Sequence, residues 1–234
     1  MRTIKNFSNF KVYHATGTIF LDSIKKNGLK NYNLDKQYKL IEALKNLYNC
    51  IPSELKKHPD FEAKVRRSNY IICRTINQDN PSYMYGPLFA TTSLKIAKEF
   101  ALSRTKGSEL LTTIFNLYDF CNSNEWFGKN EIGEKFKSQF NELINFLDIK
   151  NNPIIFCFET NLTSVASEEG DASEEYFSWL QELDEDYLEN VGESLRITQP
   201  NVIPSSALQY YEYIEDTWRG PFSLVESQGE SDTK

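Results

Sequence analysis

Residues 10–17 read FKVYHATG, in which a short apolar run ends in His14 and is followed by small residues and a glycine. The run predicts a strand, and the apolar spacing over residues 19–24 predicts a helix directly after it. A polar side chain at the mouth of a strand can face a pocket, and small neighbours let a ligand approach the backbone closely. A core histidine satisfied by hydrogen bonds would give the same pattern, so His14 alone does not identify a site. The other histidine, His58, lies in the sequence KKHP, which is typical of a surface turn.

A second informative segment, residues 85–93, reads YGPLFATTS. The Gly-Pro pair breaks the preceding element, and residues 88–90 predict a short strand. The hydroxyl residues 91–93 can cap a following helix by accepting its unpaired backbone N–H groups. That helix is predicted by apolar residues at 94, 97, 100 and 101, which share one face. A hydroxyl cluster at such a junction is more often a cap than a binding site.

A third segment, residues 192–197, reads GESLRI and predicts a strand that begins with the carboxylate of Glu193. By itself, this glutamate is explained equally well as an exposed charge at a sheet edge.

In this order, the three segments resemble the ADP-ribosyltransferase fold of diphtheria-like toxins and poly-ADP-ribose polymerases. That family carries His or Arg on its first strand, an aromatic or Ser-Thr-Ser segment before a central helix, and a catalytic glutamate opening a late strand. Residues 13–16 are similar to the first motif of the histidine-bearing (H-Y-E) branch, residues 88–93 to the second and residues 192–197 to the third. The resemblance covers about residues 10–215.

The resemblance implies an α+β fold of two packed, mainly antiparallel sheets with helical insertions. It implies an NAD-dependent ADP-ribosyltransferase that moves ADP-ribose from NAD to a macromolecule and releases nicotinamide. Glu193 would hold the ribose 2′-hydroxyl and stabilise the cationic transition state, and His14 would hydrogen-bond the ribose. The backbone at Ala15 would bind the nicotinamide amide, while Thr91 and Ser93 would position Glu193 or the ribose. The remaining residues expected to contact NAD are Thr16, Tyr85 and Phe89.

The chain departs from the family pattern at two positions. Where the polymerases carry the tyrosine that stacks on nicotinamide, the simplest register gives Leu88, with Phe89 beside it and Tyr85 three residues earlier. The arginine-modifying branch has a second Glu or Gln two positions before its catalytic glutamate, and this chain has Val191 there. An arginine acceptor is therefore less expected.

Three other functions fit the same segments. An NAD glycohydrolase would pass ADP-ribose to water, and a non-catalytic domain on the same fold would only bind. An RNA 2′-phosphotransferase would need several arginines around its phosphates, whereas these segments offer only Arg74 and Arg196.

The charge distribution bears on the acceptor. Residues 1–75 contain 15 Lys and Arg against 6 Asp and Glu, a net +9, although the whole chain carries −7. A basic region on an acidic protein can bind nucleic acid, and solvated helix faces would produce the same count. The pairs Lys56-Lys57 and Arg66-Arg67 favour an RNA or DNA acceptor. The acidic remainder keeps a protein acceptor open.

Length and composition predict a single domain over residues 1–224, with a helical insertion at about 34–67 and a disordered tail at 225–234. The 234 residues include four scattered cysteines, Cys50, Cys73, Cys121 and Cys157, which predict free thiols rather than a metal site. The absence of a long apolar run or a signal peptide favours a cytoplasmic protein of a microbe or its host, with no membrane partner. Abundant Lys, Asn and Ile suit an AT-rich microbial or phage gene. By analogy we expect a toxin or antiviral-defence effector, with an antitoxin or immunity protein as a further expected partner.

Overall fold

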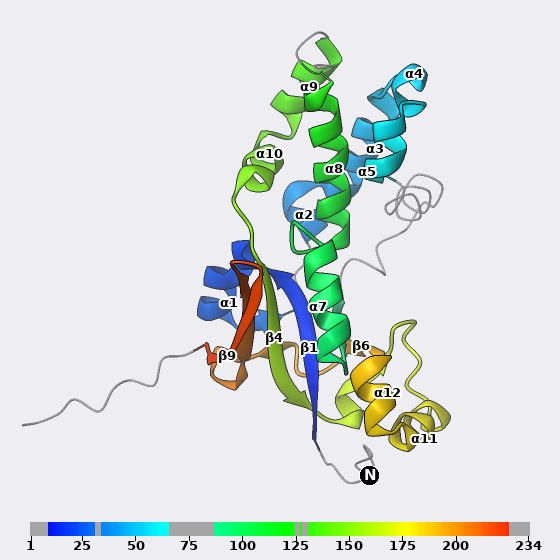
Figure 1. The fold of residues 1–234 in the computed structure, drawn as a ribbon, viewed down its shortest axis with the longest axis vertical. Coiled ribbons are helices and arrows are strands. Elements are labelled where there is room, and N and C mark those ends of the chain that lie inside the picture. Colours follow the sequence, from blue (N-terminus) through cyan, green and yellow to red (C-terminus); the bar gives the residue numbers. More distant parts are fainter. Residues whose placement is uncertain (1–8, 31–33, 66–86, 125–126, 128–130, 225–234) are drawn as a thin grey trace, which may run out of the picture. The chain divides into compact units, whose positions relative to one another are not determined.

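The computed structural model describes residues 9–30, 34–65, 87–124, 127 and 131–224 (Figure 1). These residues fall into two compact units, each with its own core. The sheet unit takes residues up to 31, 87–105 and from 152 onward, and the helical unit takes 32–86 and 106–151. The predicted site residues belong to the sheet unit, except Tyr85, which lies outside the described residues.

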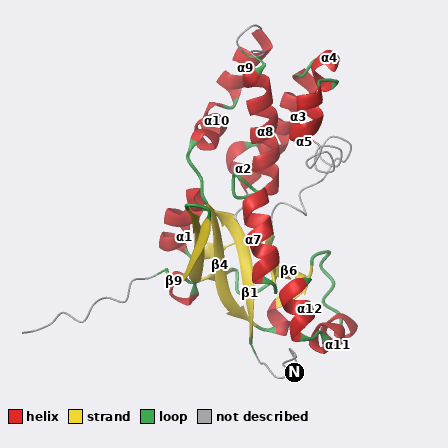
Figure 2. Cartoon of the chain, in the orientation of Figure 1, coloured by secondary structure: helices red, strands yellow, loops and turns green. Residues whose placement is uncertain are grey.

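The sheet unit is built on a seven-stranded sheet in which every pair of neighbours is antiparallel (Figure 2). Its strands in spatial order are β5 (Val165–Ser167), β6 (Ser194–Ile197), β3 (Leu88–Thr91), β1 (Phe10–Gly17), β4 (Pro153–Thr160), β8 (Gln209–Ile214) and β9 (Thr217–Ser223). A second sheet has two antiparallel strands, β2 (Leu29–Lys30) and β7 (Val202–Ile203). The expected α+β class with antiparallel sheets is therefore confirmed.

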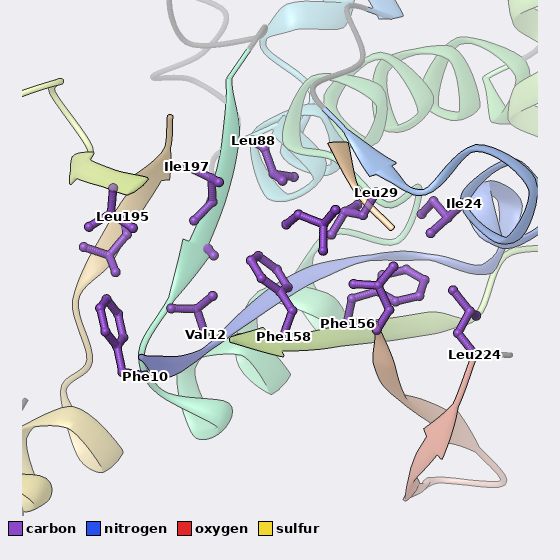
Figure 3. Packing of buried hydrophobic residues seen from close by; sticks show 14 of the residues in the cluster. Phe10, Val12, Ile24, Leu29, Leu88, Phe156, Phe158, Leu195, Ile197 and Leu224 are labelled. Carbon is purple, nitrogen blue, oxygen red and sulfur yellow. The ribbon is translucent and has the colours of Figure 1, made fainter. Parts of the chain in front are cut away.

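One face of the large sheet, which we call the core face, carries the main hydrophobic core (Figure 3). Val12, Phe156 and Leu195 on this face are almost completely buried. The small sheet joins the same core through Leu29 and Ile203, so the two sheets pack together. Further residues of this core come from helices α1 (Leu21–Asn27) and α11 (Glu174–Glu182) and from the segment before α12 (Glu185–Asn190).

The opposite face, which we call the α7 face, is covered by helix α7 (Leu94–Ser103). Ala97 and Ala101 of this helix are fully buried against Ile155 of β4. Small residues on the helix let it lie close to the sheet. Because side chains alternate along a strand, each residue of β1 and β3 belongs to one of these two faces.

Short 3₁₀ turns complete the sheet unit, at Thr18–Phe20, Leu162–Ser164 and Ser205–Ala207. The helical unit contains α2 (Leu34–Tyr38), α3 (Leu40–Cys50), α4 (Ser53–Lys56), α5 (Pro59–Val65), α8 (Glu109–Ser123), α9 (Glu131–Gln139) and α10 (Asn141–Asp148). Leu44, Leu111 and Phe120 are fully buried between α3, α5 and α8.

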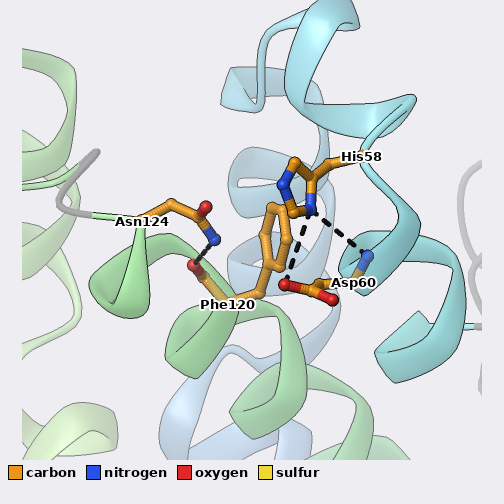
Figure 4. A network of polar contacts seen from close by, with 4 residues as sticks. All are labelled: His58, Asp60, Phe120 and Asn124. Atoms are coloured by element: carbon orange, nitrogen blue, oxygen red, sulfur yellow. Dashed lines mark hydrogen bonds and ion pairs between the residues drawn. The ribbon is translucent and has the colours of Figure 1, made fainter.

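Aromatic contacts hold α5 and the turn before it against α8. The rings of Phe61 and Phe120 meet edge to face at 5.3 Å. His58 is exposed, as predicted, and its Nδ1 accepts the backbone N–H of Asp60 at 3.2 Å (Figure 4). Asn124 donates to the Phe120 carbonyl at 2.8 Å and so caps the end of α8.

A buried lysine stabilises the end of α10. Lys106 donates to the carbonyl oxygens of Leu147 and Ile149, and its ammonium lies 4.3 Å from the centre of the Phe115 ring. Burial lowers the pKa of Lys106. Cations at a helix C-terminus interact favourably with its carbonyls, so this charge has a structural partner within the helical unit.

The cysteines Cys50, Cys121 and Cys157 are free thiols, the last two buried, as predicted; Cys73 lies outside the described residues. In the described part of the chain, no helix combines the length and apolar character that a bilayer crossing requires.

Candidate functional site

His14 lies in the middle of β1 on the core face, opposite Phe156 of β4. Its Nδ1 lies 2.6 Å from the carbonyl oxygen of Phe89 on β3. A carbonyl oxygen can only accept, so Nδ1 carries the hydrogen. Burial lowers the pKa of His14, which favours the neutral ring. The remaining ring nitrogen, Nε2, is then an acceptor available to a hydroxyl group.

Glu193 stands directly before β6 and is held by Thr92. The backbone N–H of Glu193 donates to Thr92 Oγ1 at 2.9 Å, and the backbone N–H of Thr92 donates to the Glu193 carbonyl at 3.1 Å. The backbone bond extends the β3–β6 ladder by one residue beyond Thr91 and Ser194, and the Thr92 hydroxyl accepts the N–H that a backbone carbonyl would accept in a regular ladder. Thr92 was absent from the predicted site, although the predicted hydroxyl cluster contained it.

The turn into Glu193 is packed tightly against the end of β3. Gly192 has a φ of +70°, and a Cβ there would lie 2.6 Å from the Cβ of Ser93 and 3.0 Å from Thr91 Oγ1. Its N–H donates to the Tyr187 carbonyl at 2.8 Å, which ends α12. Glycine is required at this position because both the left-handed backbone and the close approach exclude a side chain.

Ser93 and Thr91 act on the backbone around this turn. Ser93 accepts the N–H of Ile96 at 3.2 Å, which makes it the N-cap of α7, as the sequence allowed. The same hydroxyl donates to the Glu189 carbonyl at 2.5 Å, and Thr91 Oγ1 accepts the Ser93 N–H at 3.3 Å. The hydroxyl cluster thus ties α12 to the end of β3.

The strand register places His14 and Glu193 on the same face of the sheet. Tyr13 pairs with Thr91, and Thr91 pairs with Ser194, so Glu193 shares a row with Val12. His14 lies two residues further along β1, on the same side as Val12. Strand spacing near 4.8 Å and a rise near 3.3 Å per residue put the two Cα atoms about 12 Å apart. This separation is within the span of one sugar-sized ligand and the two side chains.

The other predicted residues are divided between the two faces. Thr16 lies on the core face with His14 and is buried beside Ile154. Ala15, Phe89 and Thr91 occupy the alternate positions, and Ala15 and Tyr13 pack toward α7. The Phe89 side chain therefore points away from the face of His14, whereas Leu88 lies on that face.

Tyr176 is a site residue that the sequence did not reveal. Its ring packs on the main core, and its hydroxyl is buried without a hydrogen-bond partner among the described residues. Burial and then the charge of Glu193 raise its pKa, so the hydroxyl lies near that carboxylate. A buried hydroxyl without a partner is uncommon and costs about 1–3 kcal/mol. A ligand hydroxyl at Glu193 would provide the missing partner.

Glu193 is half-buried in an acidic environment. Burial, followed by the nearby carboxylate of Glu168, raises the pKa of Glu193. Perturbed carboxylates of this kind occur often at active sites. Among the described residues, no group of His, Cys, Asp and Glu side chains is arranged to hold a metal ion.

A pocket of about 350 Å³ opens at one end of the same strands, where β3 and β5 begin and β6 ends. It is lined by residues 87–88, 166, 170, 196–198 and 200–201. None of the described residues that are predicted to bind NAD lines this pocket, but Leu88 and Ile197 belong to the face that carries His14.

Comparison of the chain with protein-family models, with curated proteins and with solved structures gives no match. What the site can do therefore follows from its own residues and their geometry.

Replacement of Glu193 by glutamine should change the pH dependence of stability. Because the folded-state pKa of Glu193 is raised, the folded protein holds this proton more tightly than the unfolded chain does. The associated stabilisation is present below the ordinary glutamate pKa of about 4.3 and is lost as pH rises through the raised value. Calorimetric melting across this range should show a smaller loss for Glu193→Gln than for wild type.

At neutral pH, Glu193→Gln should melt at the wild-type temperature or above it. Glu159→Gln is the matched control, because Glu159 is an exposed strand residue, and it should follow the wild-type pH dependence. A Glu193→Gln protein that melts well below wild type at neutral pH would contradict this electrostatic description.

Proposed function

We propose that this chain is an NAD-consuming enzyme with an ADP-ribosyltransferase-like fold, which transfers ADP-ribose from NAD to a macromolecular acceptor. The observation that carries the proposal is the placement of a neutral histidine and a half-buried glutamate on one face of one sheet. A further support is that the three family-like segments occupy the adjacent strands β1, β3 and β6. The contacting residues His14 and Phe89 are 75 positions apart, and Thr92 and Glu193 are 101 apart.

The chemistry needs the residues found there. When the bond between nicotinamide and ribose breaks, its electron pair leaves with nicotinamide, which departs neutral, and positive charge develops on the ribose. A fixed carboxylate such as that of Glu193 stabilises this charge, and partial burial strengthens the effect. The acceptor then attacks the ribose carbon and releases its proton to solvent.

The side chains around Glu193 suit a ribose. The Glu193 carboxylate can accept a hydrogen bond from one ribose hydroxyl, and Nε2 of His14 can accept one from another. The buried Tyr176 hydroxyl can bond either the ribose or Glu193 itself. In the family-like register, Leu88 offers an apolar surface to the nicotinamide in place of an aromatic ring.

The acceptor is the least specified part of the proposal. Of the basic residues that favour nucleic acid, Lys57 is exposed, but Lys56 lies 4.0 Å over the Tyr48 ring and burial lowers its pKa. Arg66 and Arg67 lie outside the described residues, as does the loop with Tyr85. Both a nucleic acid and a protein therefore stay as proposals.

The test of the function is incubation of the purified chain with cell lysate and NAD labelled in its adenylate phosphates. Nicotinamide release and labelled macromolecules are expected, and separate protease and nuclease digestion then identifies the acceptor class. Nicotinamide release without a labelled macromolecule assigns water as the acceptor, which makes the chain an NAD glycohydrolase. Absence of nicotinamide release and of label contradicts the proposal.

Glu193→Gln should lower nicotinamide release by about 10²- to 10³-fold, the loss typical when one preorganised electrostatic contact to a transition state is removed. The dissociation constant for NAD should change little, because the lost charge acts mainly in the transition state. Steady-state kinetics and equilibrium titration measure the two effects. Glu159→Gln should keep wild-type turnover, and near-normal release by Glu193→Gln would remove this glutamate from the mechanism.

Tyr176→Phe should reduce kcat/KM for NAD about tenfold without lowering the melting temperature. The reason is that the hydroxyl has no partner in the described protein, so its removal breaks no internal hydrogen bond, whereas a bond to the ligand would be lost. Tyr210→Phe is the matched control, since Tyr210 packs on the same core beside Phe156 and Phe222. Full activity in Tyr176→Phe, or a clear drop in its melting temperature, would show that the hydroxyl has only a structural role.

A further inference from the structure

We propose that the pocket at the end of β3, β5 and β6 binds a phosphate group through Arg196. This inference extends the proposed function, which supplies the ligand that carries the phosphate. The pocket volume of about 350 Å³ is at the lower end of small-molecule sites and suits a phosphate with part of its nucleoside.

Among the described residues that line the pocket, Arg196 is the one with a charged side chain. The side chain is half-buried and makes no ion pair or hydrogen bond in the described part of the chain. Half-buried guanidinium groups are normally paired, because their five N–H donors have to be satisfied. The planar fork of donors matches two phosphate oxygens at once.

The rest of the lining adds donors and no carboxylate. The hydroxyl of Thr198 and the amide of Asn201 can both donate to an anion, and neither Asp nor Glu lines the described pocket. Charge-assisted bonds from a guanidinium with neutral donors around it are the usual composition of a phosphate site. The chemistry of the pocket therefore favours an anion over a cation.

The backbone at Gly170 passes close to this guanidinium. A Cβ on Gly170 would lie 3.3 Å from Nη1 of Arg196, and the glycine has a φ of +97°. The turn is closed by the Gly170 N–H, which donates to the Ser167 carbonyl at 2.9 Å, and by the Ser167 N–H, which donates to the Asp171 carbonyl at 2.8 Å. A side chain at Gly170 would crowd the donors that the phosphate needs.

Nearby acidic residues limit what the pocket can accept. Glu168, Glu169 and Asp171 are exposed on the same turn but do not line the pocket. At physiological salt, exposed charges are screened beyond about 8 Å. These carboxylates would oppose a long polyanion more than a single phosphate or pyrophosphate, so we expect a compact phosphate ester rather than a duplex backbone.

The position of the pocket relates it to the candidate active site. Arg196 is three residues beyond Glu193 on the same strand, about 10 Å along the sheet, and its side chain leaves the strand on the face opposite to that of Glu193, as that of its partner Phe89 does. Because the pocket lies at the ends of the strands and is also lined by Leu88 and Ile197 of the core face, a phosphate there and a ribose at Glu193 belong to one NAD molecule only if that ligand passes around the strand ends. They can also belong to a donor and to a nucleotide acceptor. The guanidinium would bind the phosphate in the same way in both cases, so the two sources are distinguished with different probes.

The experiment is calorimetric titration of the full chain and its variants with two probes at low and at physiological salt. The first probe is ADP, which carries the phosphates of NAD without nicotinamide. The second is a short single-stranded oligonucleotide with a 5′-phosphate, compared with its unphosphorylated twin. The variants are Arg196→Gln, Arg196→Lys and Thr198→Asp, which adds a negative charge at an exposed lining position.

Arg196→Gln and Thr198→Asp should each weaken ADP binding at least tenfold, with a smaller loss for Arg196→Lys, which keeps the charge but not the fork. Arg219→Gln is the control, because Arg219 is exposed on β9 at the other edge of the sheet and pairs with Glu215 at 2.7 Å; it should bind like wild type. The phosphate belongs to the acceptor if the Arg196 and Thr198 variants bind ADP like wild type but no longer bind the 5′-phosphorylated oligonucleotide more tightly than its unphosphorylated twin.

Wild-type affinity of the folded Arg196→Gln and Thr198→Asp proteins for both probes would overturn the phosphate site, and so would a wild-type protein that binds neither probe. If Arg196→Gln has a much lower melting temperature than wild type, Thr198→Asp still tests the site, because it leaves Arg196 in place. A different result is expected if the phosphate site is real but the proposed NAD-consuming function is wrong. In that case Arg196-dependent ADP binding persists while no nicotinamide is released from NAD.

Discussion

The hydrogen bond from the His14 imidazole to the Phe89 carbonyl is the contact on which the candidate site depends. β1 pairs with β4 along its whole length, whereas its pairing with β3 is confined to Tyr13 and Thr91. The His14 ring satisfies a β3 carbonyl beyond that pair and links two segments that are distant in sequence. The same bond fixes the tautomer, because the carbonyl requires the hydrogen on Nδ1 and leaves Nε2 as the acceptor. One hydrogen bond therefore both links β1 to β3 and sets the tautomer of His14.

A second constraint holds Glu193 in place relative to this histidine. Gly192 lies so close to Ser93 and Thr91 that the chain can pass only with a left-handed glycine. Thr92 then fixes the backbone of Glu193 from both sides. The carboxylate is half-buried near Glu168, and this environment raises its pKa. The hydroxyl cluster, which could be explained simply as a helix cap, performs that role through Ser93 and also positions the glutamate.

Much of the fold was predictable from local patterns, and the exceptions have physical causes. The apolar run at residues 153–159 predicts a buried strand and the apolar and aromatic residues at 208–214 predict a closing strand, and the structure has β4 and β8 there. β5 was missed because its three residues lie in a polar segment, too short to show a period. β9 was missed because it is mostly exposed and contains Gly220-Pro221, so pairing with β8 rather than an apolar pattern defines it. The sequence of residues 121–132 predicts irregular structure, whereas α8 continues to Ser123 and buries Cys121.

The candidate site was predictable for the residues that belong to a sequence motif. It was not predictable for the residues whose face of the sheet depends on the strand register. His14 and Glu193 came from the motifs. Whether their neighbours face them depends on pairing, since a shift of one residue moves every side chain to the other face. The pairing of Tyr13 with Thr91 places Phe89 on the α7 face and Leu88 on the core face, and this register is not readable from the segment itself. Tyr176 carried no local signal, because its aromatic neighbours gave only a helical pattern.

The most direct measurement is a crystal structure of the chain bound to a carbocyclic NAD analogue, whose nicotinamide bond cannot be cleaved by oxocarbenium chemistry. We expect the sugar-like ring on the core face, with its hydroxyls within hydrogen-bond distance of the Glu193 carboxylate and of Nε2 of His14. An analogue bound on the α7 face, or away from both side chains, would contradict the assignment of this face as the NAD site.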